Sequence, residues 1–348
     1  MSSVTEEIRR TDREIIDLIS KRTDLAEKIG RIKTGGGILA RDRETEEEVV
    51  NIYRESSKRI RVGEDTLEQI ARALIKEAAD RKVSIAYPGR KKVSVVGGAG
   101  MMGRWMADLF SVSGCDVEII DPASDNSLTL DSASGSDIVA VSVPIYAADS
   151  VLKELDGICG SDALIFDLTS LKTPVAETLT DMAERRKVCS IHPMFGPSAK
   201  SMFDRNLVIC DCGCRQAVEE AASFFGVRGG NIRIMPIGRH DEYMSYVLGL
   251  SHAVNIAFFT VLGRSGIPYE DMRTVASTTF MKNMETNRSV ASEDPRLYYD
   301  IQHLNNFRDT MWGMFSDAVE DIKKASLDGD PSEFIKIMDA GRKYFTRT

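Results

Sequence analysis

One short segment limits the possible folds of this 348-residue chain more than any other. An apolar run over 93–96 leads directly into a GxGxxG motif, and a helix-forming stretch follows over 104–112. In this motif the first glycine permits a tight turn, the second lets the backbone approach a pyrophosphate, and the third lets the helix pack on the strand. The phosphates then lie on N–H groups at the start of the helix. The order of strand, turn and helix predicts a dinucleotide site at Gly98, Gly100, Met101, Met102 and Gly103.

A carboxylate stands where the second strand of such a unit ends. The apolar run from Val117 ends in Asp121, 18 residues beyond Gly103. An aspartate there can accept hydrogen bonds from both ribose hydroxyls and repels a 2′-phosphate, which favours NAD over NADP. The alternative is a glycine-rich turn beside an aspartate that caps a helix. The order of strand, turn, helix and acid favours the dinucleotide site.

Short apolar stretches alternate with helix-forming ones after residue 92. Alternation of this kind predicts βαβ units and a parallel sheet. From about residue 240 the sequence is helical, without strand signals. We therefore expect an α/β chain with an all-α domain over 1–85, a Rossmann-like doubly wound parallel sheet over 92–236 and an all-helical domain over 237–348. The expected strands are VSVVG from Val93, VEIID from Val117, IVAVSVP from Ile138, ALIFDL from Ala163 and NLVIC from Asn206.

The first 85 residues predict three helices, over 4–33, 43–61 and 65–83. Three helices of this length form a poor core alone, so pairing with a second copy into a homodimer is expected. Arg22 and Lys33 fall on the apolar stripe of the first helix. They are 11 residues apart, roughly 16 Å along the axis, so both side chains could converge on one ligand, although they could equally reach past the stripe to water. The stripe consists of Ile8, Ile15, Ile19, Ala26 and Ile29.

Charge and composition restrict the partners. The net charge of −8 argues against a nucleic-acid or anionic-membrane surface. We find no apolar run near the length of a membrane span and no signal peptide, so we expect a cytoplasmic protein that acts on small molecules. Cys210, Cys212 and Cys214 lack a nearby fourth ligand, which argues against a metal site and favours a strand end followed by a loop.

A histidine occupies a promising place in the sheet. His192 follows the apolar strand KVCSI and begins the segment HPMFGP, whose two prolines and glycine give a rigid loop. The carboxyl ends of strands in a doubly wound sheet face the ligand crevice, so His192 could act as a general base there. A buried histidine bonded to backbone groups is the alternative, and the residues alone leave both open.

Four segments together resemble the prephenate dehydrogenases, especially those fused to a mutase. They are GGAGMMGR (97–104), SVPI (142–145), DLTSLK (167–172) and HPMFGP (192–197), and the resemblance runs in order over most of 92–310. It implies oxidative decarboxylation of prephenate to 4-hydroxyphenylpyruvate with NAD, in tyrosine biosynthesis. Through SVPI it adds Ser142 and Pro144 to the cofactor-binding residues.

The same resemblance implies roles for four further residues. His192 would bind the ring hydroxyl of prephenate and take its proton, and Ser170 would orient that group. Arg288, in NRSVASEDP, would grip a substrate carboxylate, and His252, in GLSHAV, would line the pocket. His240 is interpreted as structural, in a helix-capping role.

A second resemblance covers the first 80 or so residues. The segment IDLISKRTDLAEKIGRIK, which ends in Lys33, and the segment RDRE (41–44) resemble the all-helical chorismate mutases. Their reaction is a rearrangement that needs orientation and cations, not a nucleophile. The resemblance implies that Arg22 and Lys33 hold the substrate carboxylate and ether oxygen, that Arg43 and Glu44 supply an ion pair and a hydroxyl contact, and that Lys82 donates to the ether oxygen. Departures from the pattern occur at Thr5, Ala40, Ala78 and Lys82.

Three alternatives remain at this point. The dehydrogenase could act on arogenate, which carries an amine where prephenate has a keto group. It could be a β-hydroxyacid or imine-reducing dehydrogenase, although that class does not explain HPMFGP. The N-terminal helices could also be a catalytically silent dimerisation or regulatory module.

Overall fold

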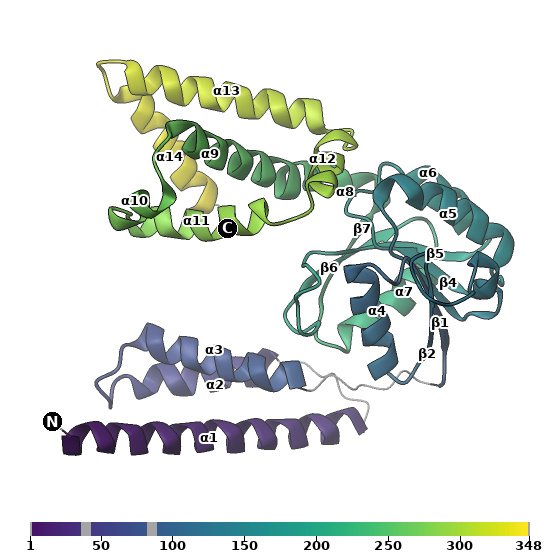
Figure 1. The fold of residues 1–348 in the computed structure, drawn as a ribbon, viewed down its shortest axis with the longest axis horizontal. Coiled ribbons are helices and arrows are strands. Elements are labelled where there is room, and N and C mark those ends of the chain that lie inside the picture. The colour runs from purple at the N-terminus through teal and green to yellow at the C-terminus, as the bar shows by residue number, and fades with distance from the viewer. Residues whose placement is uncertain (1, 36–42, 82–88, 347–348) are drawn as a thin grey trace. The chain divides into compact units, whose positions relative to one another are not determined.

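The computed structural model describes residues 2–35, 43–81 and 89–346, and side chains within these ranges except at 2, 30–35, 80 and 81. Contacts divide the chain into two compact units (Figure 1). The first comprises Met1–Ser170 and Val175–Ile237, and the second comprises Leu171–Pro174 and Gly238–Thr348.

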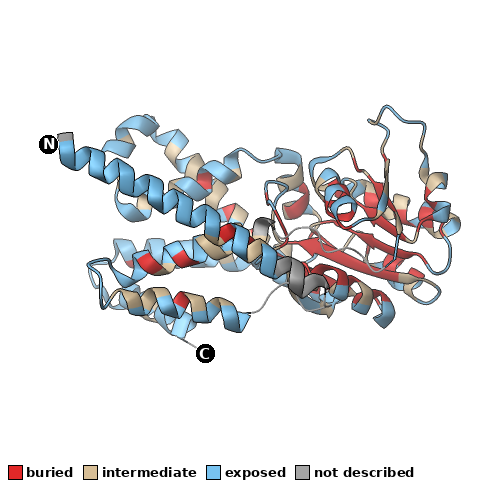
Figure 2. Cartoon of the chain, turned by 90° about the horizontal axis from the view of Figure 1, so that it is seen from below, coloured by how far each residue is buried: buried red, intermediate tan, exposed pale blue. Residues whose placement is uncertain are grey.

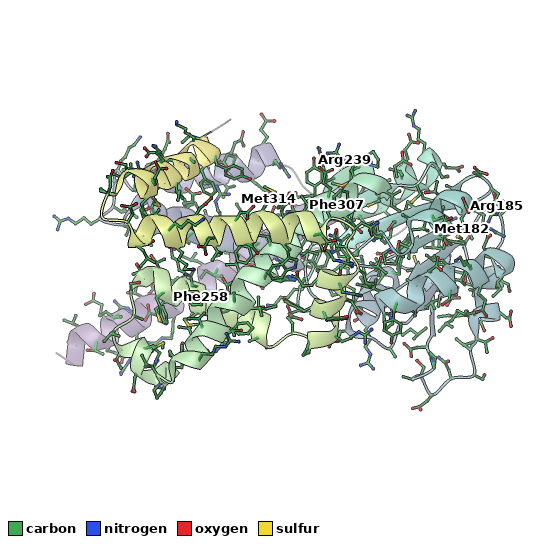
Figure 3. The ribbon with its side chains drawn as sticks, turned by 90° about the horizontal axis from the view of Figure 1, so that it is seen from above. Met182, Arg185, Arg239, Phe258, Phe307 and Met314 are labelled. Atoms are coloured by element: carbon green, nitrogen blue, oxygen red, sulfur yellow. The ribbon has the colours of Figure 1, made fainter. Side chains whose placement is uncertain are left out.

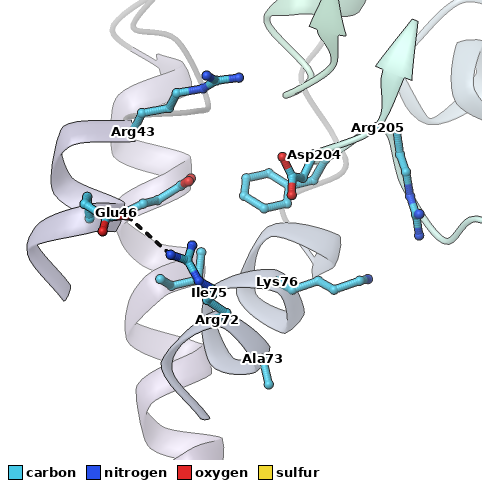
Figure 4. A pocket seen from close by; sticks show the side chains of 10 residues that line it. Arg43, Glu46, Arg72, Ala73, Ile75, Lys76, Asp204 and Arg205 are labelled. Carbon is cyan, nitrogen blue, oxygen red and sulfur yellow. Dashed lines mark ion pairs between the residues drawn. The ribbon is translucent and has the colours of Figure 1, made fainter. Parts of the chain in front are cut away.

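The N-terminal part of the first unit is three helices, as expected: α1 (Ser2–Gly35), α2 (Arg43–Ser56) and α3 (Glu64–Arg81). Helix α2 ends five residues before the predicted end at 61, because a turn begins where Ser57 N donates to Arg54 O. Ion pairs join α2 to α3, among them Arg72 with Glu47 at 3.6 Å (Figure 4). Most of α1 is exposed (Figure 2). Few side chains described in these helices are buried: Thr23, Val50, Leu67, Ala71 and Ala78.

A seven-stranded sheet of order β2-β1-β3-β4-β5-β6-β7 forms the rest of this unit. The first five strands in that order are parallel, which confirms the expected Rossmann-like core. Strand β6 runs antiparallel to β5, and β7, which the sequence analysis did not anticipate, pairs parallel with β6. The strands are β1 (Lys92–Val96), β2 (Asp116–Ile120), β3 (Ile138–Val141), β4 (Leu164–Asp167), β5 (Lys187–Pro193), β6 (Asn206–Asp211) and β7 (Asn231–Pro236).

Helices cover both faces of the sheet. Successive side chains of a strand point to opposite faces, so neighbouring residues belong to different cores. Phe166 packs in one core with residues of α4 (Met101–Val112) and α7 (Arg215–Gly226). Its neighbour Ile165 packs in a second core with residues of α5 (Ile145–Ile158) and α6 (Ala176–Ala183). The domain is therefore doubly wound (Figure 1). Between β2 and β3 lies the short helix η1 (Leu130–Gly135).

The second unit is helical throughout its described residues, as expected. Helix α8 runs through a π-helical turn into α9, and Gly266 ends α9 in the left-handed conformation, at φ 74°. Tyr246 in the π-helical turn donates to Met314 Sδ at 3.5 Å, which links this turn to α13 (Figure 3). The elements are α8 (Ile237–Met244), η2 (Ser245–Leu250), α9 (Ser251–Ser265), α10 (Tyr269–Thr274), α11 (Thr278–Ala291), α12 (Pro295–His303), α13 (Arg308–Leu327) and α14 (Ser332–Thr346).

One continuous helix contradicts the expectation that no apolar run approaches the length of a membrane span. Among the described residues, Ile237–Ser265 is long and apolar enough to cross a membrane by length and composition alone. The sequence analysis found no such run, because Arg239, His240, Asp241 and Glu242 interrupt the apolar residues at its start. Length and composition are weak grounds for a membrane span, and core helices of soluble proteins meet the same criteria.

Candidate active site

Several of the residues expected to bind cofactor or substrate lie at the carboxyl ends of five neighbouring strands. Strands β2, β1, β3, β4 and β5 are parallel and adjacent in that order, so their carboxyl ends share one edge of the sheet. In the same order this edge carries Asp121, the glycine turn at 97–103, Ser142, Ser170 and His192. In an open α/β sheet, ligands bind along this edge.

The tight turn lies one residue earlier than predicted. Gly97, not Gly98, has a positive φ, of 78°. A Cβ atom on Gly97 would lie 2.4 Å from the Ser142 carbonyl oxygen, so no other residue fits there. Gly98 is constrained by packing instead, since its Cβ would lie 2.7 Å from Ile119 Cγ2. Gly97 was missed, although it directly precedes the GxGxxG motif.

The other two glycines allow close approach of the backbone. A Cβ on Gly103 would lie 2.3 Å from the Gly97 carbonyl oxygen, so the helix packs on the turn as the motif predicts. A Cβ on Gly100 would meet only Gly97 O, at 3.3 Å. Gly100 precedes α4 without a side-chain cap. The amides of the first turn of a helix lack intrahelical partners, and they attract anions.

Asp121 is held in place beside this turn. Its Oδ2 accepts from Ala99 N at 3.0 Å, and its Oδ1 accepts from Ala123 N at 2.8 Å. An ionised carboxylate has about four acceptor positions, so these two bonds leave each oxygen able to accept a ribose hydroxyl. The glycine turn, the amides at the start of α4 and the fixed carboxylate fit an NAD molecule.

The remaining cofactor residues of the sequence analysis lie at the same edge. Met101 and Met102 form the first turn of α4, with Met101 exposed. Ser142 directly follows β3, and its backbone N donates to Val96 O at 2.7 Å. Pro144 precedes α5.

Ser170 lies in the loop after β4, which a buried aspartate holds. Asp167 Oδ2 accepts from Thr169 N at 2.9 Å and from Thr169 Oγ1 at 2.5 Å, and its Oδ1 accepts from Ser190 in β5. Asp167 is fully buried, whereas Ser170 is partly exposed. The sequence analysis missed Asp167. An acid at the end of the apolar run ALIF is the signal that could have found it.

His192 lies inside β5, not after it as predicted. The strand extends to Pro193, because His192 pairs with Val208 of the antiparallel strand β6. His192 is 4% exposed. It comes two residues after Ser190, whose partner in β4 is Asp167, so His192 and the Ser170 loop leave adjacent strands at the same edge.

Two predicted substrate residues belong to the second unit. His252 in α9 stacks on Tyr298 with 4.1 Å between ring centroids, and burial lowers its pKa to about 4. Its Nδ1 is buried and has no hydrogen-bond partner among the described residues. Arg288 in α11 lies over Tyr269, with its guanidinium carbon 5.8 Å from the ring centroid. In the described part of the chain no carboxylate lies within 4.0 Å of Arg288, so its charge is available.

The expected mutase residues are only partly described. Arg22 Nη1 donates to the Leu74 carbonyl of α3 at 2.8 Å. Arg43, in the pocket of Figure 4, donates to Asn231 Oδ1 at 2.6 Å, and Glu44 is exposed in the first turn of α2. The side chain of Lys33, and Ala40 and Lys82 entirely, lie outside the described residues. Thr5 is exposed and Ala78 is buried.

Three family models match this chain in succession. Residues 4–83 match chorismate mutase type II, residues 100–234 match the prephenate dehydrogenase nucleotide-binding domain, and residues 237–340 match the prephenate dehydrogenase dimerization domain. The two dehydrogenase models together span more than half of the chain.

Individual proteins agree with these matches. The T-protein of Enterobacter agglomerans is 25% identical over 306 residues, which cover 86% of this chain and 81% of that protein. The T-protein of Haemophilus influenzae is 26% identical over 306 residues, covering 86% and 80%. The crystal structure of Aquifex aeolicus prephenate dehydrogenase with hydroxyphenyl propionate and NAD+ has the same fold, with a TM-score of 0.59 at 18% identity over 74% of this chain and 99% of that one. The chain belongs to the prephenate dehydrogenase family and carries a chorismate mutase type II domain at its N-terminal side.

Proposed function

We propose that this chain converts chorismate to prephenate in its N-terminal helices and oxidises prephenate to 4-hydroxyphenylpyruvate and CO2 with NAD. The observation that carries the proposal is the order of residues along the carboxyl edge of the sheet, from Asp121 through the glycine turn to Ser170 and His192. Ligands bind along this edge in open α/β sheets, which supports a nucleotide site and a base at these residues. The two products serve tyrosine biosynthesis.

His192 is the general base of the oxidation. NAD, when bound, would supply the acceptor for the hydride of the carbinol carbon, and the ring carboxylate would leave as CO2. His192 would accept the proton of the ring hydroxyl as the hydride leaves, and would return it to the phenolate oxygen once CO2 has departed, so that the hydroxyl of the product is restored. A neutral imidazole suits this task near neutral pH. Pairing with Val208 of β6 fixes the backbone of His192. Ser170, after the adjacent strand, orients the hydroxyl.

NAD binds at the glycine turn. Gly100 would let the backbone approach the pyrophosphate, and Gly98 and Gly103 keep the turn packed on its neighbours. The amides of Met101 and Met102 would be the donors, and Asp121 would accept from the ribose hydroxyls. The fit rests on the close contacts that a Cβ would make at Gly103 and on the two amides that orient Asp121. Ser142 and Pro144 line the cofactor at the neighbouring strand.

Arg288 and His252 bind the substrate. Prephenate carries two carboxylates, and the exposed Arg288 guanidinium, without a carboxylate partner in the described part of the chain, is suited to grip one of them. His252 contributes differently. Because its pKa is lowered to about 4, it is neutral at physiological pH and offers hydrogen bonds but no charge.

The N-terminal helices hold chorismate by its charges. Arg22 and Lys33 bind the carboxylate and ether oxygen, and Arg43 with Glu44 supply an ion pair and a hydroxyl contact. The bond from Arg22 to Leu74 O directs the guanidinium across the helix interface, toward α3. Lys82, which lies outside the described residues, is assigned by its place in the sequence as the donor to the ether oxygen.

We assign residues 1–85 to the mutase, 92–236 to nucleotide binding and 237–348 to substrate binding and dimerisation. The chain works as a cytoplasmic homodimer. The match of 237–340 to a dimerization domain and the few buried side chains of α1–α3 both support a second copy.

Steady-state kinetics of two variants test the dehydrogenase assignment. His192→Asn is expected to lower kcat by about 10²–10⁴, the usual contribution of a general base, with little change in prephenate affinity. Arg288→Gln serves as the contrast, because it should raise KM for prephenate without changing NAD affinity. Near-normal turnover of His192→Asn would remove His192 from the mechanism.

A further inference from the structure

A buried aspartate in the helical unit binds the chain directly after Ser170. Residues 171–174 belong to the helical unit although they follow β4 in the chain. Asp241 in α8 accepts from Lys172 N at 2.9 Å through Oδ1 and 3.1 Å through Oδ2, and from Thr173 N at 2.6 Å. The amides of Lys172 and Thr173 therefore both donate to one carboxylate.

Asp241 is itself held from two sides. His240 Nδ1 lies 2.6 Å from Asp241 Oδ1, and Asn305 Nδ2 donates to the Asp241 carbonyl at 2.9 Å. His240, Asp241 and Asn305 are 0%, 4% and 2% exposed. Burial favours the neutral acid, but hydrogen bonds from His240, Thr173 and Lys172 outweigh it and hold the pKa of Asp241 below its usual range. Since an ionised carboxylate only accepts, the proton between the pair lies on His240 Nδ1.

Ser170 thus lies between two carboxylate anchors. On its amino side Asp167 binds Thr169, one residue away, and on its carboxyl side Asp241 binds Lys172, two residues away. Loops move more than the strands that they follow, unless their backbone groups are bonded. The buried carboxylates of Asp167 and Asp241 hold the backbone on both sides of Ser170, so the backbone of Ser170 has little freedom to move.

We propose that Asp241, oriented by His240, is a positioning residue that fixes Ser170 for catalysis. This inference rests on the role proposed above for Ser170. Asp241 does not touch the reacting atoms. It acts through the amides of Lys172 and Thr173, and an error of about 1 Å in the position of a catalytic group can cost on the order of 10²-fold in rate.

Kinetics of Asp241→Asn and Ser170→Ala, alone and combined, test the inference on the full chain with prephenate and NAD. The asparagine keeps one acceptor oxygen, but its NH2 group would face N–H donors where the second carboxylate oxygen was. We therefore expect kcat to fall on the order of 10²-fold, with NAD affinity retained. If Asp241 acts through Ser170, the double variant should be no slower than the slower single variant. Asp300→Asn is the matched control, because Asp300 is equally buried in the helical unit but pairs with Arg296. It should leave kcat unchanged.

The outcomes separate the two proposals. A normal kcat in Ser170→Ala rejects the role of Ser170. Two outcomes reject the positioning role of Asp241 alone. In the first, kcat is low in Ser170→Ala but is the same in Asp241→Asn as in Asp300→Asn. In the second, the losses of kcat in the two single variants multiply in the double variant.

Variants at His240 carry the test if Asp241→Asn does not fold. His240→Asn keeps an N–H donor near the place of Nδ1, whereas His240→Leu removes it. We expect His240→Asn to retain more of kcat than His240→Leu. Equal loss in both would overturn the inference.

Discussion

At the scale of single residues, Asp121 serves both the fold and the proposed cofactor site. Its oxygens hold the amides of Ala99 and Ala123, and the same oxygens are proposed to accept the ribose hydroxyls. Substitution of Asp121 therefore affects both the turn and the cofactor. The preference for NAD over NADP separates the effect on the cofactor from the effect on the turn, because only the charge of the carboxylate discriminates against a 2′-phosphate.

Asp121→Ser is expected to raise KM for NAD and to shift the ratio of kcat/KM values toward NADP. A charge-assisted hydrogen bond contributes about 1.5–3 kcal/mol, so the ratio should move by about tenfold or more. Asp211→Ser is the matched control, since Asp211 also follows an apolar strand run and accepts from the amide two residues on, Gly213 N, at 2.8 Å. An unchanged cofactor ratio in Asp121→Ser would place the discriminating group elsewhere.

At the scale of elements, the turn between β1 and α4 depends on one glycine. Gly97→Ala forces a side chain into φ 78° and puts its Cβ 2.4 Å from the Ser142 carbonyl oxygen. Gly114→Ala measures the cost of the positive φ alone, because Gly114 has φ 79° with nothing within 4 Å of its Cβ position. The left-handed conformation alone costs about 1–2 kcal/mol.

Urea unfolding should therefore show a loss of about 1–2 kcal/mol for Gly114→Ala and a distinctly larger loss for Gly97→Ala, together with weaker NAD binding. Equal losses would mean that the backbone around Ser142 yields to the new side chain. NAD affinity should be unaffected in Gly114→Ala.

Elements with a clear period were predictable, and those set by tertiary pairing were not. The five apolar strand runs and the glycine motif follow from local chemistry. Strand β7 was missed because its side chains are mostly half-buried or exposed, and Arg233 breaks its apolar pattern. The antiparallel direction of β6 was also missed. No helix separates Pro193 from Asn206, and without a crossover helix a strand can return antiparallel.

The sequence can propose a candidate site residue where a motif carries it, but not where only the fold brings residues together. His192 and Ser170 were proposed through HPMFGP and DLTSLK, and their roles stay predictions. His240 was interpreted as helix-capping, yet it is fully buried and bonded to Asp241. Asp241 was missed because its partners, Lys172 and Thr173, are about 70 residues away in the chain.

At the scale of the whole molecule, the proposed second copy would cover an apolar stripe that α1 exposes. Helix α1 exposes Ile8, Ile15 and Ile19 by 57%, 49% and 39%. Each fully buried isoleucine contributes about 1.5–3 kcal/mol, so covering this stripe would stabilise the helices substantially. Arg22 lies on the same stripe, and a partner that covers the stripe would also enclose the proposed chorismate site.

Ile15→Asp should therefore abolish most conversion of chorismate while prephenate oxidation continues, because the charge would be buried against the partner helix. Ser20→Asp adds the same charge about 140° around α1 from Ile15, on an exposed position, and should leave both activities intact. Parallel assays with chorismate and with prephenate plus NAD on each variant measure the two activities separately. Unchanged chorismate turnover in Ile15→Asp would show that the mutase helices function without covering this stripe. Loss of prephenate oxidation as well would show that the stripe supports the entire chain.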